Sequence, residues 1–226
     1  MTIIEFPPVS SADRSGLIAI GGDFEVESLV LAYSSGIFPW PSPDYPLAWF
    51  APPRRAIIEF ENYHESKSFL RWLKNTEFTV TCNTAFASTM RCCAGGHVKP
   101  GETAEESTWI TAEMISAYTE LHNAGVAHSC EVWEGDNLVG GVYGISIGAM
   151  FAAESMFHRR DNASKLALHS LVAHLKVCGV SWIDVQVINA FTKSLGATEI
   201  KRDKFMQMLN EAINKPALKF PNHLES

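Results

Sequence analysis

The fold is decided by residues 129–157, which read SCEVWEGDNLVGGVYGISIGAMFAAESMF. Ser129 to Trp133 alternates in polarity as a strand does, and Gly135-Asp136-Asn137 is typical of a turn. Leu138 to Ile147 is predicted to run back as a second strand, and Ala149 to Phe157 as a third after a turn at Gly148. Three strands joined by such short turns predict an antiparallel meander.

The segments around this meander predict helices and further strands. Apolar residues recur at helical spacing in four segments, at residues 66–75, 83–93, 111–123 and 162–177. An apolar strand is predicted at 182–187, and a short helix end then leads into a last strand near 198–200. The order of meander, long helix, strand, helix and strand predicts an α+β fold. It resembles the acetyltransferase-like (GNAT-type) α/β fold.

The first sixty residues differ in composition from the rest, because proline, glycine and aromatic residues are concentrated there. They predict turns, short elements and one helix from Glu27 to Ser34. We therefore expect a small N-terminal domain at 1–60, packed on a catalytic domain at 61–226. A loop is expected from Gly95 to Ser107, since that stretch holds three glycines and a proline.

Composition excludes several classes of protein. The chain has 226 residues, 46% of them hydrophobic, and a net charge of −7. No apolar run approaches the roughly 18 residues of a membrane span, and the first residues lack the features of a signal peptide. The five cysteines are odd in number and form no C-x-x-C pair, so a reducing cytoplasm is expected. The histidines lack the spacing typical of metal ligands, so no metal site is predicted.

A set of short motifs occurs in a characteristic order along the chain. They are Gly21-Gly22-Asp23, Gly36-Ile37-Phe38-Pro39-Trp40, Thr108-Trp109-Ile110-Thr111, Glu131-Val132-Trp133, Gly140-Gly141-Val142-Tyr143-Gly144, Glu154-Ser155-Met156-Phe157, Asn162-Ala163-Ser164-Lys165, Ile183-Asp184-Val185-Gln186-Val187 and Ser194-Leu195-Gly196-Ala197. Together they resemble the leucyl/phenylalanyl-tRNA–protein transferase family over about residues 6–205. Val185 and Phe191 depart from the family pattern, which usually has Cys and His there.

The resemblance implies a reaction and its partners. An aminoacyl-tRNA carrying leucine, phenylalanine or methionine would donate its amino acid to the N-terminal arginine or lysine of an acceptor protein, which is thereby marked for degradation by the N-end rule. The ester of the donor is already activated, so no cofactor is expected. Because an α-amine has a pKa of about 7.7–8.0, it needs positioning and modest proton removal rather than a strong base.

Asp184 and Gln186 stand two apart on the strand at 182–187, so regular alternation places both side chains on one face. Two polar groups on a core strand are costly unless they are paired or used. From the residues alone, they are either a catalytic pair or a hydrogen-bonded pair that braces the sheet. The resemblance implies that they act together on the attacking amine, with Asp184 either as the base or as the group that orients Gln186.

Further site residues follow from the resemblance. Glu154 and Asn189 are expected to bind the acceptor N-terminus, although Glu154 could instead pair with Arg159 or Arg160 at a rim. The aminoacyl side chain is expected in an apolar pocket, and Trp49 and Trp109 are expected to stack on the terminal adenosine. The pocket candidates, any of which could be ordinary core, are Met156, Phe151, Tyr118, Val142 and Leu171.

A tRNA partner requires a basic patch on this acidic chain. Lys67, Arg71 and Lys74 are spaced four and three apart, so they share one face of the helix predicted at 66–75. They are expected to contact tRNA phosphates, and the alternative is a merely solvated face.

Two other functions remain open from the sequence. One is an acyl-CoA-dependent N-acetyltransferase, against which the turn Arg159 to Ser164 counts because it has no glycine to cradle a pyrophosphate. The other is a catalytically silent tRNA-binding module, which would not need Asp184, Gln186 and Glu154 together.

Overall fold

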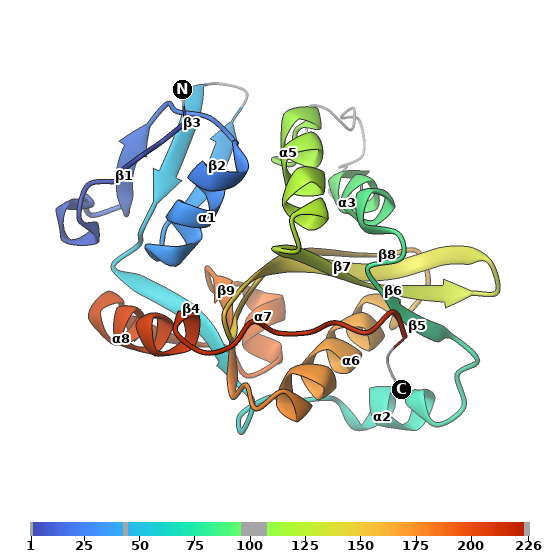
Figure 1. The fold of residues 1–226 in the computed structure, drawn as a ribbon. Coiled ribbons are helices and arrows are strands. Elements are labelled where there is room, and N and C mark those ends of the chain that lie inside the picture. The colour runs from blue at the N-terminus through green and yellow to red at the C-terminus, as the bar shows by residue number, and fades with distance from the viewer. Residues whose placement is uncertain (1, 43–44, 96–107, 224–226) are drawn as a thin grey trace.

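The computed structural model describes residues 2–42, 45–95 and 108–223. The N-terminal part contains a 3-10 turn at Val9–Ser11, a small sheet and helix α1 (Val26–Ser34). The small sheet is antiparallel, has the strand order β1-β3-β2, and consists of β1 (Leu17–Ile20), β2 (Phe38–Ser42) and β3 (Tyr45–Phe50). It forms a separate lobe at the N-terminal end of the molecule (Figure 1).

A larger sheet of seven strands carries the rest of the chain, in the order β10-β4-β9-β8-β7-β6-β5. Its strands are β4 (Arg54–Glu59), β5 (Thr79–Cys82), β6 (Ala127–Glu134), β7 (Asn137–Ile147), β8 (Met150–His158), β9 (Trp182–Gln186) and β10 (Thr198–Lys201). Strands β6, β7 and β8 are the antiparallel meander. Strands β8 and β9 run parallel, which the intervening helix makes possible.

Helices cover both faces of the larger sheet. The helices are α2 (Lys67–Leu73), α3 (Phe86–Gly95), α5 (Ala112–Asn123), α6 (Ala163–Val177), α7 (Ala190–Ser194) and α8 (Arg202–Ile213). Helix α6 lies along one face of the meander, while α3 and α5 lie on the other (Figure 1). The two faces bury separate apolar cores. A Cβ on Gly140 of β7 would lie 2.6 Å from the Cβ of Ala163, so glycine lets α6 pack closely on the meander.

The predicted α+β fold is confirmed, with the meander, the long helix and the last two strands in the expected places. Ser66 and Thr111 cap their helices by accepting hydrogen bonds from Phe69 N and Met114 N. The expectation that a helix begins at Asn83 is wrong: this residue has φ 61° and its side chain accepts from Ser129 N, so α3 begins at Phe86.

The division of the chain at residue 60 stays a prediction. Strand β4 lies within the first sixty residues, yet it pairs with β9 and β10 in the larger sheet. The change from the small sheet to the larger one therefore occurs between β3 and β4. The loop predicted at 95–107 lies outside the described residues, apart from Gly95, which ends α3.

Candidate active site

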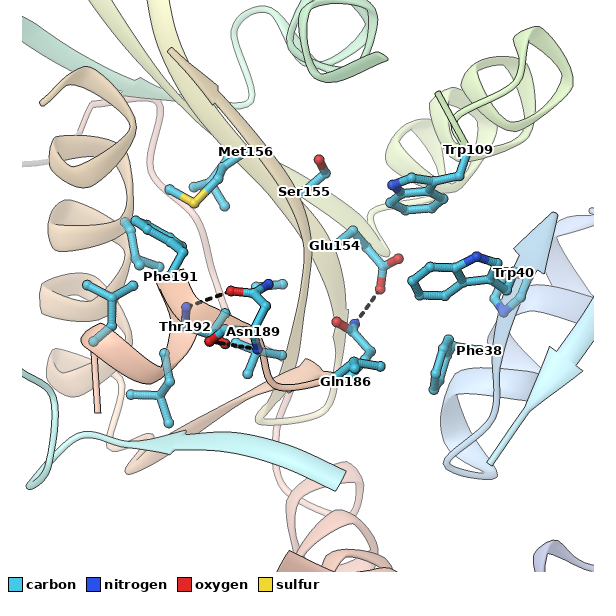
Figure 2. A pocket seen from close by; sticks show the side chains of 18 residues that line it. Phe38, Trp40, Trp109, Glu154, Ser155, Met156, Gln186, Asn189, Phe191 and Thr192 are labelled. Atoms are coloured by element: carbon cyan, nitrogen blue, oxygen red, sulfur yellow. Dashed lines mark hydrogen bonds between the residues drawn. The ribbon is translucent and has the colours of Figure 1, made fainter. Parts of the chain in front are cut away.

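A pocket of about 380 Å³ opens between the two sheets. Figure 2 shows a hydrogen bond near its centre, which Gln186 Nε2 donates to Glu154 Oε1 at 2.8 Å. On one side of this bond lie three rings, of Phe38, Trp40 and Trp109, which we call the aromatic lobe. Met156 and Phe191 lie on the other side.

The second side of the pocket is apolar and continues into the core beneath α6. We call it the aliphatic lobe, and its members are Ile58, Val142, Met156, Leu168 and Leu195. Val142 and Met156 are direct partners across β7 and β8. Glu154 is the one charged side chain among the described residues that line the pocket. The pocket therefore offers two mainly apolar compartments with the Gln186–Glu154 pair between them, and Ser155, Asn189 and Thr192 add further polar groups to its lining.

A bulge at the end of β9 sets the position of Gln186. Ala56 of β4 pairs with Gln186 and Ile57 pairs with Asp184, so Val185 is an extra residue without a partner on β4. Gln186 has φ 55°, in the left-handed region that non-glycine residues rarely adopt. As a result Val185 and Gln186 both line the pocket, whereas Asp184 does not. The regular alternation expected for this strand therefore breaks at its end.

Asp184 is buried and held on both carboxylate oxygens. Arg55 Nε donates to Oδ1 at 2.8 Å, and Arg55 NH2 donates to Oδ2 at 2.7 Å. Oδ1 also accepts from the backbone N–H of Gln186 at 2.9 Å. Of the two roles left open for Asp184, this geometry favours orienting Gln186 over removing the proton directly.

Glu154 lies near the centre of β8, where its side chain is half-buried in the wall of the pocket. Burial is the main cause that raises the pKa of Glu154 to about 8. A hydrogen bond from the Tyr33 hydroxyl lowers that pKa, the negative charge of Asp184 raises it, and Arg55 lowers it. A carboxyl group with a pKa in this range can gain and lose a proton near neutral pH.

Two buried tyrosine hydroxyls lie next to Glu154, and that of Tyr33 donates a hydrogen bond to its carboxyl group. Tyr33 and Tyr118 share a hydrogen bond of 2.7 Å between their hydroxyl oxygens, and both rings are buried. Burial raises the pKa of both hydroxyls well above the usual value, so they stay protonated and able to donate. The alternative in which Glu154 pairs with Arg159 or Arg160 is wrong, because Arg160 Nε binds Glu134 at 3.0 Å and Arg159 NH2 donates to Cys92 Sγ at 3.3 Å.

Two family models match this chain in succession. The leucyl/phenylalanyl-tRNA protein transferase N-terminal domain matches residues 22–53, and the leucyl/phenylalanyl-tRNA protein transferase model matches residues 57–210. The chain belongs to this family. A family member from Pectobacterium carotovorum is 47% identical over 92% of this chain and 87% of its own length. Another, from Pseudoalteromonas translucida, is 44% identical over 100% of this chain and 94% of its own length.

The solved structures that resemble this chain share less sequence identity with it than these family members do. L-PGS from Bacillus licheniformis is 10% identical, with a TM-score of 0.40, over 73% of this chain and 51% of that one. A ribosomal-protein-alanine N-acetyltransferase from Brucella melitensis is 13% identical, with a TM-score of 0.34, over 66% of this chain and 99% of that one. Family membership rests on the two family models and the sequence relatives.

Trp49 is not a base-stacking residue, so this part of the prediction is wrong. It is fully buried, packs against Phe6 with ring centroids 5.0 Å apart, and donates from Nε1 to Gly21 O at 2.8 Å. Trp40, unlike Trp49, is partly exposed in the pocket. It is 40% exposed, lines the pocket, and stacks on Trp109 with ring centroids 5.7 Å apart and an interplanar angle of 17°.

The expected aminoacyl pocket is partly corrected. Val142 and Met156 line the cavity, and their contact with the aminoacyl side chain stays a prediction. Tyr118, Phe151 and Leu171 are not among its lining residues, because their side chains are buried in the cores on either side of the sheet.

Asn189 lines the pocket next to α7. Its Oδ1 accepts from Thr192 N at 2.9 Å, so the side chain also caps that helix. Its contact with an acceptor stays a prediction.

The predicted basic face is exposed on α2. Its members Lys67, Arg71 and Lys74 are all exposed to solvent. On the other side of the helix Phe69 is buried and packs against His169 of α6, with ring centroids 5.9 Å apart. Helix α2 lies at the opposite end of the molecule from β1 (Figure 1). Contact of these three residues with tRNA stays a prediction.

Sequence reasoning missed Arg55 and Phe191 as site residues. Arg55 is only 2% exposed although it stands in a chain segment rich in proline and charge. An arginine followed by the apolar run Ala56-Ile57-Ile58 was the available signal, since a buried arginine requires a paired acid. Phe191 was noted only as a departure from the family pattern, but it lines the pocket and is 37% exposed.

The described residues contain no group of three or more His, Cys, Asp or Glu that could hold a metal ion. No helix among them is long and apolar enough to cross a membrane.

Proposed function

We propose that this protein transfers leucine, phenylalanine or methionine from aminoacyl-tRNA to the N-terminal arginine or lysine of acceptor proteins. The observation that carries the proposal is the hydrogen-bonded Gln186–Glu154 pair between an aromatic and an aliphatic lobe. Membership of the transferase family supports it. We further propose that the reaction takes place in the cytoplasm and marks its acceptors for degradation by the N-end rule.

The two lobes fit the two ends of an aminoacyl-adenosine. Indole faces stack on bases with about 1–3 kcal/mol per base, so the terminal adenine is assigned to Trp40 and Trp109. The uncharged side chain of leucine or phenylalanine is assigned to the aliphatic lobe. Met156 is flexible and polarizable, which suits a compartment that accepts both branched and aromatic groups. The ester carbonyl that joins the two ends then lies near Gln186 and Glu154.

The same pair can handle the attacking amine. Gln186 donates its Nε2 to Glu154, and Figure 2 shows its amide oxygen directed away from that bond. In our proposal this oxygen accepts a hydrogen bond from the α-amine of the acceptor and orients its lone pair toward the ester carbon. Attack forms the new C–N bond, and ionised Glu154 removes the proton from nitrogen. The C–O bond then breaks, and the 3′ oxygen of the adenosine leaves with the proton that Glu154 took from nitrogen.

An acyl-CoA-dependent N-acetyltransferase is the second candidate function. The turn between β8 and α6 contains no glycine from Arg159 to Ser164, and Asn162 adopts φ 66° in it. This turn lacks the glycines with which acyl-CoA enzymes cradle a pyrophosphate. A catalytically silent tRNA-binding module is the third candidate. It has no need for a carboxyl group whose pKa burial raises to about 8.

The test is transfer of labelled leucine from charged tRNA to a protein that begins with arginine. We expect incorporation without acetyl-CoA or ATP, and none when the acceptor's α-amine is acetylated beforehand. The matched control acceptor differs only in a glycine at its N-terminus and should accept little label. A requirement for acetyl-CoA would support the second candidate. Binding of charged tRNA without any transfer would support the silent module.

A further inference from the structure

Arg55 is held between two aromatic rings inside the protein. Its guanidinium carbon lies 4.5 Å from the ring centroid of Phe38 and 4.6 Å from that of Phe205. Its NH1 donates to Gly36 O at 3.2 Å, just before β2. The guanidinium therefore connects α8 and the start of β2 to the strand on which it stands. Few rotamers are open to a planar group enclosed on both faces.

The remaining donors of Arg55 fix the conformation of β9. They bind both oxygens of Asp184, and the Oδ1 of Asp184 accepts from Gln186 N. This last bond fixes the backbone N–H of Gln186, and a bond from Val187 N to Val185 O at 2.6 Å closes the turn in which Gln186 takes its left-handed conformation. Such a conformation persists only where the surroundings enforce it. One of the contacts that enforce it here leads from Gln186 through Asp184 to Arg55.

We infer that Arg55 is a positioning residue for the transfer reaction, which acts through Asp184 to hold the Gln186 amide against Glu154. Arg55 does not line the pocket and touches no reacting atom. The inference rests on the proposed function. Lysine cannot replace Arg55, because an ammonium group lacks the planar fork that binds both carboxylate oxygens and fits between two rings.

The test is a double-mutant cycle with Arg55→Lys, Gln186→Ala and the two changes combined. The rate is measured with a short leucyl-adenosine ester as donor, on proteins whose thermal melts show that they are folded. We expect Arg55→Lys to lower kcat by about tenfold or more through misplacement of Gln186, with the donor KM changed less than about threefold. In the Gln186→Ala background the same change should alter kcat by less than about twofold, because the residue it positions is gone.

Arg54→Lys is the matched control, since Arg54 is adjacent and exposed. It should leave kcat unchanged. Equal losses from Arg55→Lys with and without Gln186 would overturn the inference, because a purely structural arginine gives additive effects. Wild-type kcat in folded Arg55→Lys would overturn it as well. If the wild-type protein transfers no leucine, the proposed function fails instead.

A second variant keeps the inference testable if Arg55→Lys does not fold. Arg55→Met combined with Asp184→Asn removes both buried charges, and replacing a buried ion pair in this way is often neutral or stabilising. We expect a folded protein whose kcat is lower by at least about tenfold, and in which Gln186→Ala causes a smaller further loss than the roughly 10²-fold that it causes in the wild type. A folded double variant with wild-type kcat would overturn the inference.

Discussion

The terminal adenosine of the donor is predicted to stack on Trp40, and Trp40→Ala tests this. Stacking of a base on an indole contributes about 1–3 kcal/mol. Trp40 and Trp109 already stack on each other in the free protein, with ring centroids 5.7 Å apart, so the adenine replaces part of an existing contact. We therefore expect the lower half of that range, about 1–2 kcal/mol, which corresponds to a roughly 5- to 30-fold weaker Kd.

The assay is a calorimetric titration with a leucyl-adenosine analogue whose ester oxygen is replaced by NH, so that it binds without reacting. Trp49→Phe is the control. It removes the hydrogen bond to Gly21 O and should destabilise the fold by about 1–3 kcal/mol. It should leave affinity for the analogue unchanged, because Trp49 lies outside the pocket lining. Unaltered affinity in Trp40→Ala, or an equal loss in folded Trp49→Phe, would refute the stacking assignment.

Three further predictions concern charged groups. Because burial raises the pKa of Glu154 to about 8 and the acceptor α-amine has a pKa of about 7.7–8.0, log kcat/KM should rise below pH 8 with a limiting slope near two. Glu154→Gln should reduce that slope to one, and an unchanged slope contradicts a proton-accepting role. Asp184→Ala should lower the free energy of unfolding by about 3–5 kcal/mol, since it leaves a buried arginine unpaired; a urea titration that shows less than about 1 kcal/mol contradicts this. When alanine replaces all three residues of the basic face, the slope of log K for charged tRNA against log salt should become shallower by about 2–3. The rate with the short ester donor should not change. A variant that keeps the wild-type salt slope would show that the tRNA binds elsewhere. The three replaced residues are Lys67, Arg71 and Lys74.

The parts of the fold with strong local signals were predictable from the sequence. The meander was predicted because alternation and turn residues both occur within residues 129–157, and each strand pairs with the next one along the chain. Strand β4 was missed because its partners β9 and β10 lie more than 120 residues further on. Local sequence patterns do not indicate pairing between strands so far apart in the chain. The small sheet was missed because proline, which is rare inside strands, occurs in both β2 and β3.

The two tryptophans show why the site was only partly predictable. Trp40 and Trp49 both stand beside prolines or other aromatics, and nothing in their local sequence distinguishes an exposed ring from a buried one. The sheet register separates them: Trp49 lies opposite Pro39, and Trp40 lies opposite Ala48. Since side chains of neighbouring residues point to opposite faces of a strand, Trp49 enters the core while Trp40 faces the pocket.

The sequence prediction for Asp184 and Gln186 was correct for only one of the two residues. Alternation grouped Asp184 with Gln186, but the bulge at Val185 separates them, so Gln186 lines the pocket and Asp184 does not. A bulge depends on the partner strand and on the left-handed conformation of Gln186, which the sequence of β9 alone does not show. Glu154 was expected in the site from the family resemblance, and it lines the pocket.

The most direct measurement is the single-turnover rate of leucyl transfer, from charged tRNA bound in excess enzyme to a peptide that begins with arginine. Wild-type protein should form one new amide bond at the α-amine, and mass spectrometry should show the peptide heavier by one leucyl residue. Gln186→Ala should bind the donor with a Kd within about threefold of the wild type and transfer it about 10²-fold more slowly, because the amine is no longer oriented. Transfer by Gln186→Ala at the wild-type rate would contradict the role assigned to the Gln186–Glu154 pair.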